Sequence, residues 1–203
     1  MKVIFIRHGQ TDENVAHRHQ PTYTPLSITG RKQAVAAGKR LVDVGVTHIV
    51  ASPLIRTLQT SSLIADQLDM IPSIDHALVE LIRPTTLTGY GHHHWRSMVF
   101  YIRWYAGLTK VGESYTEMRQ RITKATDNLE GLPEDATVLV VTHSVFMSLL
   151  VSHVCNDRAL SPWGIVQAFV RLKRLKNTQM IEYTASKGEN ICGWMRTDDL
   201  NLN

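Results

Sequence analysis

The chain has 203 residues, of which 43% are hydrophobic and 20% are charged, and its formal net charge is +4 at pH 7. These values are typical of one globular domain with a sizeable core and exclude a disordered chain. The mild positive charge favours anionic ligands but is too small to indicate nucleic-acid binding by itself.

Apolar runs alternate with helical patterns along the chain, which predicts a layered α/β domain. In the first half, the expected elements are a strand over 2–6, a helix from Thr29-Gly30, a strand over 47–51 and a helix after it. Ser52 is expected to cap this last helix, with Pro53 as its first helical residue.

The second half continues the same alternation, with one segment, 170–176, that the pattern does not assign. The expected elements are an extended segment or strand over 74–81, a loop over 84–94, helices from Trp95 and from Tyr115, a strand over 137–141, a helix over 145–154, and weaker strands over 178–183 and 191–196.

Cysteine usage and hydropathy predict a cytoplasmic protein. Cys155 and Cys192 make neither a disulfide framework nor a zinc-type spacing, and the apolar start is too short for a signal peptide. Residues 138–155 lack charge but include six Ser, Thr or His residues, so a buried strand and helix is favoured over a membrane span. We therefore expect no membrane partner. The basic run over 171–176 is more typical of a solvated helix face than of a nucleic-acid site.

Arg7 and His8 stand side by side directly after the first apolar run. In open α/β sheets, ligands bind at the carboxyl ends of the strands. Arginine presents a planar fork of donors that matches phosphate, and histidine supplies a nitrogen nucleophile near neutral pH. The pair indicates covalent phosphoryl chemistry, although an adjacent Arg and His are by themselves as often a surface pair.

Two further strand-to-helix turns carry actual or potential cations. Arg56 falls in the first turn after the second strand, and His143 lies just beyond the strand over 137–141. In a parallel sheet these turns meet at one edge, where helix N-termini add N–H donors. The joint placement predicts a pocket for a dianionic phosphoryl group.

The segment Arg7-His8-Gly9-Gln10-Thr11 resembles the signature of the histidine phosphatase superfamily, which includes cofactor-dependent phosphoglycerate mutases. The resemblance implies a three-layer αβα sandwich with a mostly parallel central sheet, phosphoglycerate mutase-like, formed by residues 1–203 as one domain. The other matching motifs, in the family's order, are Asn14, 26–34, 52–60, Leu78-Val79-Glu80, Gly112-Glu113-Ser114 and Val140-Val141-Thr142-His143.

The resemblance also implies roles for these residues. His8 would attack phosphorus and form a phosphohistidine, and Glu80 would protonate the leaving oxygen and then activate water. The phosphoryl oxygens would be bound by Arg7, Arg56, His143 and Asn14. No metal or cofactor is expected, because these groups would neutralise the phosphoryl charge. A backbone carbonyl, with that of Gly9 as the candidate, would fix the tautomer of His8.

Departures from the family pattern add further candidates. Ser144 follows His143 where many relatives have glycine, and its N–H can still donate to phosphate. Arg83 is a candidate extra cation at the mouth of the site, with a solvated loop arginine as the equal alternative. Gln10 belongs to the expected outer wall and is a candidate substrate contact. Glu113 is the reserve candidate for the acid, with a helix-start carboxylate as the alternative reading.

The segment 83–112 is expected to form a cap or lid over the site. It includes His92-His93-His94, for which a polar loop is favoured over a metal site, because adjacent histidines do not share a face and no further ligand stands at a suitable spacing.

The leading hypothesis is a phosphatase that acts on a small phosphorylated substrate, with a homodimer left open. The alternatives are a phosphoglycerate mutase-type transfer and a non-catalytic phosphate-binding protein on the same fold. Glu80 and Glu113 are only 33 positions apart, which favours an open site that admits water. No segment specifies the substrate.

Overall fold

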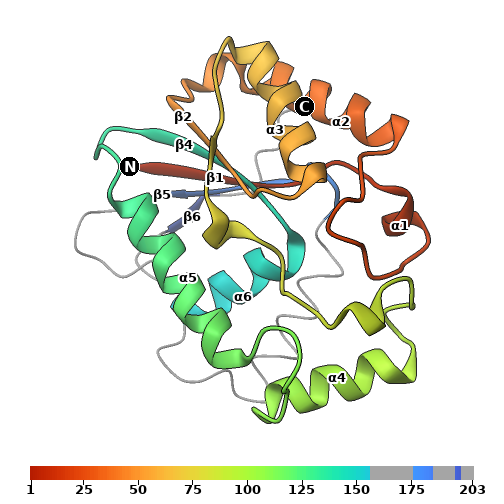
Figure 1. Cartoon of the computed structure of the whole chain (residues 1–203). Helices are drawn as coiled ribbons and strands as arrows, with labels where there is room; N and C mark the ends of the chain where they lie inside the picture. The colour runs from red at the N-terminus through yellow and green to blue at the C-terminus, as the bar shows by residue number, and fades with distance from the viewer. Residues whose placement is uncertain (156–175, 185–194, 198–203) are drawn as a thin grey trace.

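A six-stranded sheet forms the centre of the computed structural model, which describes residues 1–155, 176–184 and 195–197 (Figure 1). The strand order is β3-β2-β4-β1-β5-β6, and all pairs from β3 to β1 are parallel. β5 is antiparallel to β1, and β6 is antiparallel to β5. The strands are β1 (Lys2–Arg7), β2 (His48–Ala51), β3 (Ser73–Ile74), β4 (Thr137–Thr142), β5 (Met180–Thr184) and β6 (Met195–Thr197).

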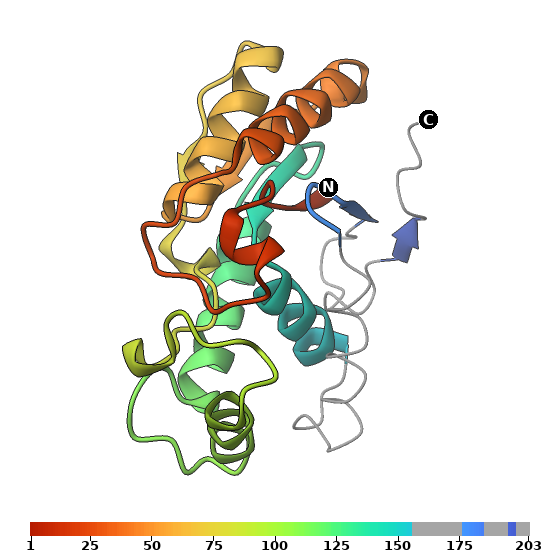
Figure 2. The same cartoon turned by 90° about the vertical axis from the view of Figure 1, so that its right-hand side faces the viewer.

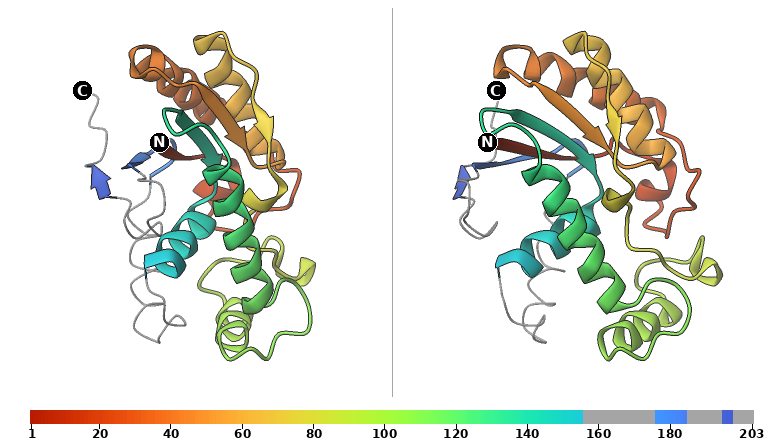
Figure 3. Two further views of the ribbon diagram at one scale, coloured as in Figure 1. Left: turned by 90° about the vertical axis from the view of Figure 1, so that its left-hand side faces the viewer. Right: turned by 60° about the vertical axis from the view of Figure 1, so that its left-hand side comes forward.

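Helices cover both faces of this sheet, so the three-layer sandwich and the mostly parallel sheet are confirmed (Figures 1 and 3). Ile4 and Ile6 of β1 face a core shared with α2 and α3, whereas Val3 and Phe5 face a core shared with α5 and α6. This alternation follows from the two-residue period of a strand. The helices are α1 (Asp12–Val15), α2 (Ile28–Leu41), α3 (Ile55–Leu68), α4 (Trp95–Tyr105), α5 (Tyr115–Glu130) and α6 (Ser144–Cys155), with short 3-10 turns η1 (Val42–Val44), η2 (His76–Leu78) and η3 (Thr85–Leu87).

The expected start of α3 was wrong. The helix begins at Ile55, and Leu54 is its N-cap residue without a side-chain cap. Ser52 remains bound to the sheet through its N–H, which donates to the carbonyl oxygen of Val141 (3.0 Å). The hydroxyl of Ser52 lies 2.9 Å from Nε2 of His143, so it serves the site rather than the helix end.

Two other expectations changed or lie outside the described residues. Only Ser73–Ile74 of the third apolar segment pairs as a strand, and the chain then turns through η2. The Asp75 side chain caps this turn by accepting from the N–H of Ala77 (2.8 Å). Segments 170–175 and 191–194 are not among the described residues.

The segment expected to form a cap folds as η3, α4 and their loops, on the far side of the site from α2 and α3 (Figure 2). It is joined to the loop after α1 by backbone hydrogen bonds. The N–H of His19 donates to Tyr90 O (2.9 Å), and the N–H of His92 donates to His17 O (3.1 Å). Within the described residues, no helix has the length and apolar character needed to cross a membrane.

Candidate active site

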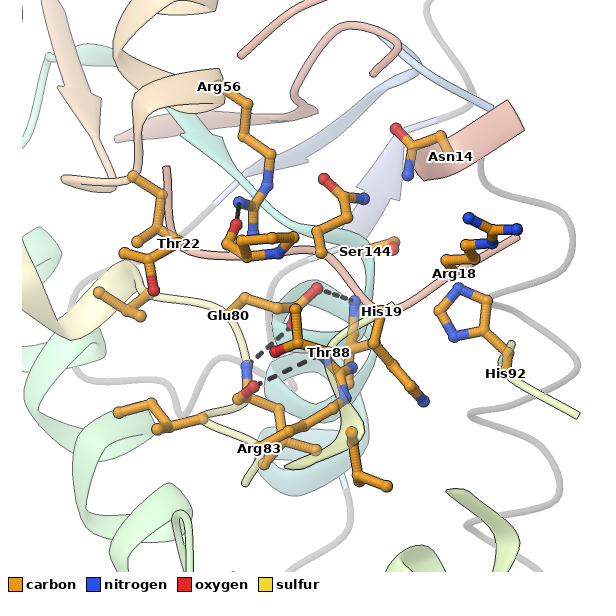
Figure 4. Close-up of a pocket in the computed structure, with 18 of the residues that line it drawn as sticks. Asn14, Arg18, His19, Thr22, Arg56, Glu80, Arg83, Thr88, His92 and Ser144 are labelled. Atoms are coloured by element: carbon orange, nitrogen blue, oxygen red, sulfur yellow. Dashed lines mark hydrogen bonds between the residues drawn. The ribbon is translucent and has the colours of Figure 1, made fainter. Parts of the chain in front are cut away.

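A cavity of about 330 Å³ lies at the carboxyl ends of β1, β2 and β4 (Figure 4). The strand-to-helix turns supply its floor, and the loops after α1 and after β3 supply its walls. The residues from these elements that carry polar groups into the lining are Arg7, His8, Asn14, Arg18, His19, Gln20, Thr22, Arg56, Glu80, Arg83, Thr85, Thr88, His92 and Ser144.

His8 is buried at the end of β1 with its ring in a defined tautomer. Nδ1 donates its proton to the carbonyl oxygen of Gly9 at 2.7 Å, which is the contact that the sequence suggested. Nε2 therefore carries the lone pair. Burial, followed by the positive charges of Arg56 and Arg7, lowers the pKa of His8 well below its ordinary value. The imidazole is thus neutral and nucleophilic at physiological pH.

Arg7 and Arg56 bring two cations into the same cavity from β1 and from the first turn of α3. Arg56 is 3% exposed, and its Nη1 donates to the carbonyl oxygen of Pro21 (3.3 Å). Burial lowers its pKa to about 10, while the charge of Glu80 raises it. Arg56 still carries its charge at neutral pH, so it can bind a phosphoryl oxygen.

His143 is a neighbour of His8 but is not among the residues of the described cavity lining. Its ring centroid is 5.3 Å from that of His8, and the side chain is fully buried. Ser52 holds its Nε2, and its Nδ1 has no hydrogen-bond partner in the described part of the chain. Burial and the charge of Arg56 lower its pKa well below the ordinary value.

Glu80 lines the cavity and is held by backbone amides. Its Oε1 accepts from the N–H groups of Leu81 and Phe146, both at 3.0 Å, and its Oε2 accepts weakly from Val145 (3.4 Å). Two of these donors belong to the N-terminus of α6, where free N–H groups attract a carboxylate. Oε2 has the weaker contact and is therefore the oxygen better suited to carry a proton.

Glu113, the reserve candidate for the acid, is not part of the cavity lining. Both of its oxygens bind the Arg121 guanidinium, at 2.6 Å to Nε and 2.7 Å to Nη2, and Oε2 also accepts from the N–H of Ile82 (3.2 Å). Arg121 in turn donates to the carbonyl oxygens of Ala77 and Val79. The Glu113–Arg121 pair therefore forms hydrogen bonds with the backbone before and after Glu80 and positions the segment that carries it.

The remaining candidates divide between the cavity and its surroundings. Asn14, Ser144 and Arg83 line the cavity. The expected contact by Gln10 is not supported, because Gln10 lies outside the lining and its Oε1 accepts from Ser27 Oγ (3.2 Å) at the start of α2.

Asn14 is oriented by a residue that the sequence did not single out. Its Oδ1 accepts from Nδ2 of Asn177 (3.1 Å), which also donates to the carbonyl oxygen of His8 (3.1 Å). The amide nitrogen of Asn14 is therefore the group available to a ligand. No local pattern marks Asn177, because it lies 163 positions from Asn14.

Sequence reasoning also missed Arg18 and His19, and it considered His92 only as part of a triplet. His19 and His92 meet edge to face, with ring centroids 4.6 Å apart. Burial lowers the pKa of His19 to about 3 and that of His92 to about 4, so both are neutral. Within the described residues, no group of three or more His, Cys, Asp or Glu side chains could hold a metal.

Comparison with known proteins gives a consistent result. The sequence profile of the histidine phosphatase superfamily (branch 1) matches residues 3–183. A protein named probable phosphoglycerate mutase GpmB from Erwinia tasmaniensis is 34% identical over 161 residues, which cover 76% of this chain and 74% of that protein.

Solved structures share the fold. A phosphoserine phosphatase from Entamoeba histolytica has a TM-score of 0.76 at 20% identity, and the match covers 98% of this chain and 96% of that one. A mycobacterial glucosyl-3-phosphoglycerate phosphatase has a TM-score of 0.73 at 23% identity, with 100% and 99% covered. At these identities the likeness establishes architecture alone.

Proposed function

Because this chain belongs to the histidine phosphatase superfamily, we propose that it is a phosphatase that hydrolyses a small phosphomonoester through a phosphohistidine at His8. The observation that carries the proposal is the state of His8. Its Nδ1 proton is committed to Gly9 O, so Nε2 presents a lone pair to a cavity that Arg7 and Arg56 also line.

The first half of the reaction transfers the phosphoryl group to the protein. Nε2 of His8 attacks phosphorus, and the bond between phosphorus and the ester oxygen breaks. Glu80 gives its proton to that oxygen, which leaves as an alcohol. The cations Arg7 and Arg56 bind the other phosphoryl oxygens and stabilise the charge of the transition state.

The second half regenerates the protein. Glu80, now a carboxylate, takes a proton from water, and the resulting hydroxide attacks phosphorus. The bond between phosphorus and Nε2 breaks, inorganic phosphate leaves, and His8 is neutral again. The ring of His143 lies 5.3 Å from that of His8 and its Nδ1 has no hydrogen-bond partner in the described part of the chain, so we assign it to the phosphoryl oxygens as a further donor.

A phosphoglycerate mutase is the second candidate, and the names of the curated relatives favour it. A mutase would return the phosphoryl group from His8 to another hydroxyl of its substrate instead of to water. Incubation with 3-phosphoglycerate separates the two. A phosphatase releases inorganic phosphate in step with substrate loss, whereas a mutase forms the 2-phospho isomer with little phosphate.

The direct test of the proposed function compares the wild-type protein with His8→Ala. The wild type should release phosphate from p-nitrophenyl phosphate and should form an acid-labile phosphoprotein on rapid quenching. His8→Ala should do neither, and His93→Ala, in an exposed loop outside the cavity lining, should behave as wild type. Substantial phosphate release by His8→Ala would overturn the mechanism.

A further inference from the structure

The cavity carries more positive charge than one phosphoryl group requires. Its described lining includes four arginines, Arg7, Arg18, Arg56 and Arg83, against a single carboxyl group, that of Glu80. The neutral groups His8, His143 and Asn14 add no compensating negative charge. A phosphomonoester dianion contributes about −2, so the bound state would retain a surplus of one or two positive charges. A second anionic group on the substrate would remove that surplus.

Arg83 is the cation best placed to bind such a group. Its Nε donates to the hydroxyl of Tyr101 (3.0 Å) on α4, and its Nη1 reaches the carbonyl oxygen of Leu81 (3.5 Å). The guanidinium also lies 5.9 Å from the centroid of the Tyr101 ring. Among the described residues Nη2 has no hydrogen-bond partner, so part of the fork is held in place while part is free to bind.

Arg83 is also distinct from the two catalytic arginines. Arg83 stands on the loop that also carries Glu80, whereas Arg7 and Arg56 come from β1 and from the first turn of α3, so Arg83 belongs to the wall from which the leaving-group oxygen would be protonated. The charge of Arg83 nevertheless reaches the site, because it lowers the pKa of Arg56. An anion bound at Arg83 would therefore belong to the leaving group rather than to the transferred phosphoryl group.

The size of the cavity limits the substrate. Its volume of about 330 Å³ is at the lower end of the range for small-molecule sites. Because His8 and Arg83 line this one cavity, both anionic groups can lie on a single small substrate, such as a short phosphorylated acid or a small bisphosphate.

We propose that Arg83, with Arg18 at the rim of the same cavity, binds a second anionic group, a carboxylate or a second phosphate, on the leaving group of a small phosphomonoester. The proposal rests on the proposed phosphatase function and assigns its substrate class. Because Tyr101 orients the guanidinium in advance, little side-chain entropy is lost on binding.

The test uses three substrates built on the same three-carbon backbone. Relative to glycerol 3-phosphate, 3-phosphoglycerate carries a carboxylate in place of the hydroxymethyl group, and glycerol 1,3-bisphosphate carries a second phosphate and no carboxylate. For the wild type, kcat/KM should be about tenfold or more higher for at least one of the two substrates with an anionic leaving group than for glycerol 3-phosphate, as expected for a hydrogen bond between charged groups. The substrate with the higher kcat/KM shows whether the second anionic group is a carboxylate or a phosphate.

The variant Arg83→Gln should reduce this ratio by about tenfold, mainly through KM, since the lost contact is made in both the ground state and the transition state. The matched control is Arg119→Gln, because Arg119 also stacks near a tyrosine ring, 6.0 Å from the centroid of Tyr115, but lies outside the cavity lining. It should leave the ratio unchanged. A wild-type ratio near one, or an equal ratio in Arg83→Gln, would overturn the proposal.

Binding to His8→Ala separates this proposal from the proposed function. Calorimetry on that variant measures affinity without turnover, so a preference for 3-phosphoglycerate or the bisphosphate that Arg83→Gln removes would support the second-anion site even if hydrolysis were absent. Absence of any phosphate release with the preference intact would overturn only the phosphatase function.

Discussion

Backbone amides, rather than a cation, hold the carboxyl group of Glu80. The N–H groups of Leu81 and Phe146 both reach Oε1, and this arrangement leaves Oε2 with only a long contact to Val145. The orientation is therefore fixed by α6, the helix that also carries Ser144 into the cavity. A glutamine at position 80 could accept the same hydrogen bonds but could not supply the proton that an alkoxide leaving group needs.

Glu80→Gln should therefore discriminate between leaving groups. With an alkyl phosphate, which requires the proton, the rate of phosphoryl transfer should fall by about 10²–10⁴. With p-nitrophenyl phosphate, which leaves without a proton, transfer to His8 should persist, and the loss should appear in the hydrolysis of the phosphohistidine. Rapid-mixing experiments should then show a burst of one equivalent of p-nitrophenol per active site.

Glu113→Gln is the matched comparison, because this carboxyl group binds Arg121 and lies outside the cavity lining. Any loss of activity in that variant should be the same for both substrates and should show no burst. Equal losses on both substrates in Glu80→Gln would contradict the assigned role of Glu80.

The start of α5 and the segment after β3 are connected by one buried ion pair. Arg121 of α5 donates to the carbonyl oxygens of Ala77 and Val79, and Glu113 binds Ile82 through both its backbone N–H (2.8 Å to O) and its side chain. These hydrogen bonds hold the backbone in place on both sides of Glu80. The element that presents the proton donor is thus anchored to α5 by these contacts and also to the sheet, because the hydroxyl of Thr142 in β4 donates to the carbonyl oxygen of Leu78 (2.8 Å).

Arg121→Met should destabilise the fold strongly. The side chain of Glu113 is only 5% exposed, so removing its cation leaves a buried carboxylate with one amide donor. The free energy of unfolding should fall by about 3–5 kcal/mol, measured by urea denaturation. The exposed Arg119→Met on the same helix should change it by less than about 0.5 kcal/mol. Equal stability of the two variants would show that the pair contributes no net stabilisation.

Elements with a local signature could be predicted from the sequence, and contacts between distant segments could not. β1, β4 and α6 follow from apolar periodicity, and placing Arg7, His8 and Arg56 at strand ends follows from the topology of parallel sheets. The local sequence predicted that Ser52 caps a helix, but its hydroxyl forms a hydrogen bond with His143, which is 91 positions away. The contact of Arg83 with Tyr101 likewise depends on how α4 packs, which no local pattern encodes.

On the scale of the whole molecule, the cavity lies between the carboxyl edge of the sheet and the loops that face it. The sheet edge supplies the phosphoryl-binding groups, and the loop after α1 together with the α4 segment supplies the outer wall. His19 connects the last two. Its Nε2 donates to Ser97 Oγ (2.9 Å) on α4, because that hydroxyl donates its own proton to Gly91 O (3.0 Å).

The free energy of unfolding should depend on pH through His19, because this side chain is 3% exposed and burial lowers its pKa to about 3. Below pH 6.5 the unfolded chain takes up a proton at this histidine, whereas the folded chain does not. The unfolded state then binds more protons, so stability falls as the pH falls. His8 and His143, whose pKa values are also lowered by burial, act in the same direction.

The variant His19→Gln measures the contribution of His19 to the loss of stability at acid pH, since glutamine can still donate to Ser97 but does not titrate. The stability advantage of the wild type over His19→Gln should be constant between pH 7 and 8, where His19 is unprotonated in both states. It should then shrink by roughly 1 kcal/mol between pH 6 and 5, measured by urea denaturation at each pH. A difference that stays constant down to pH 5 would mean that His19 accepts a proton as readily in the folded protein as in the unfolded chain, and would contradict this prediction.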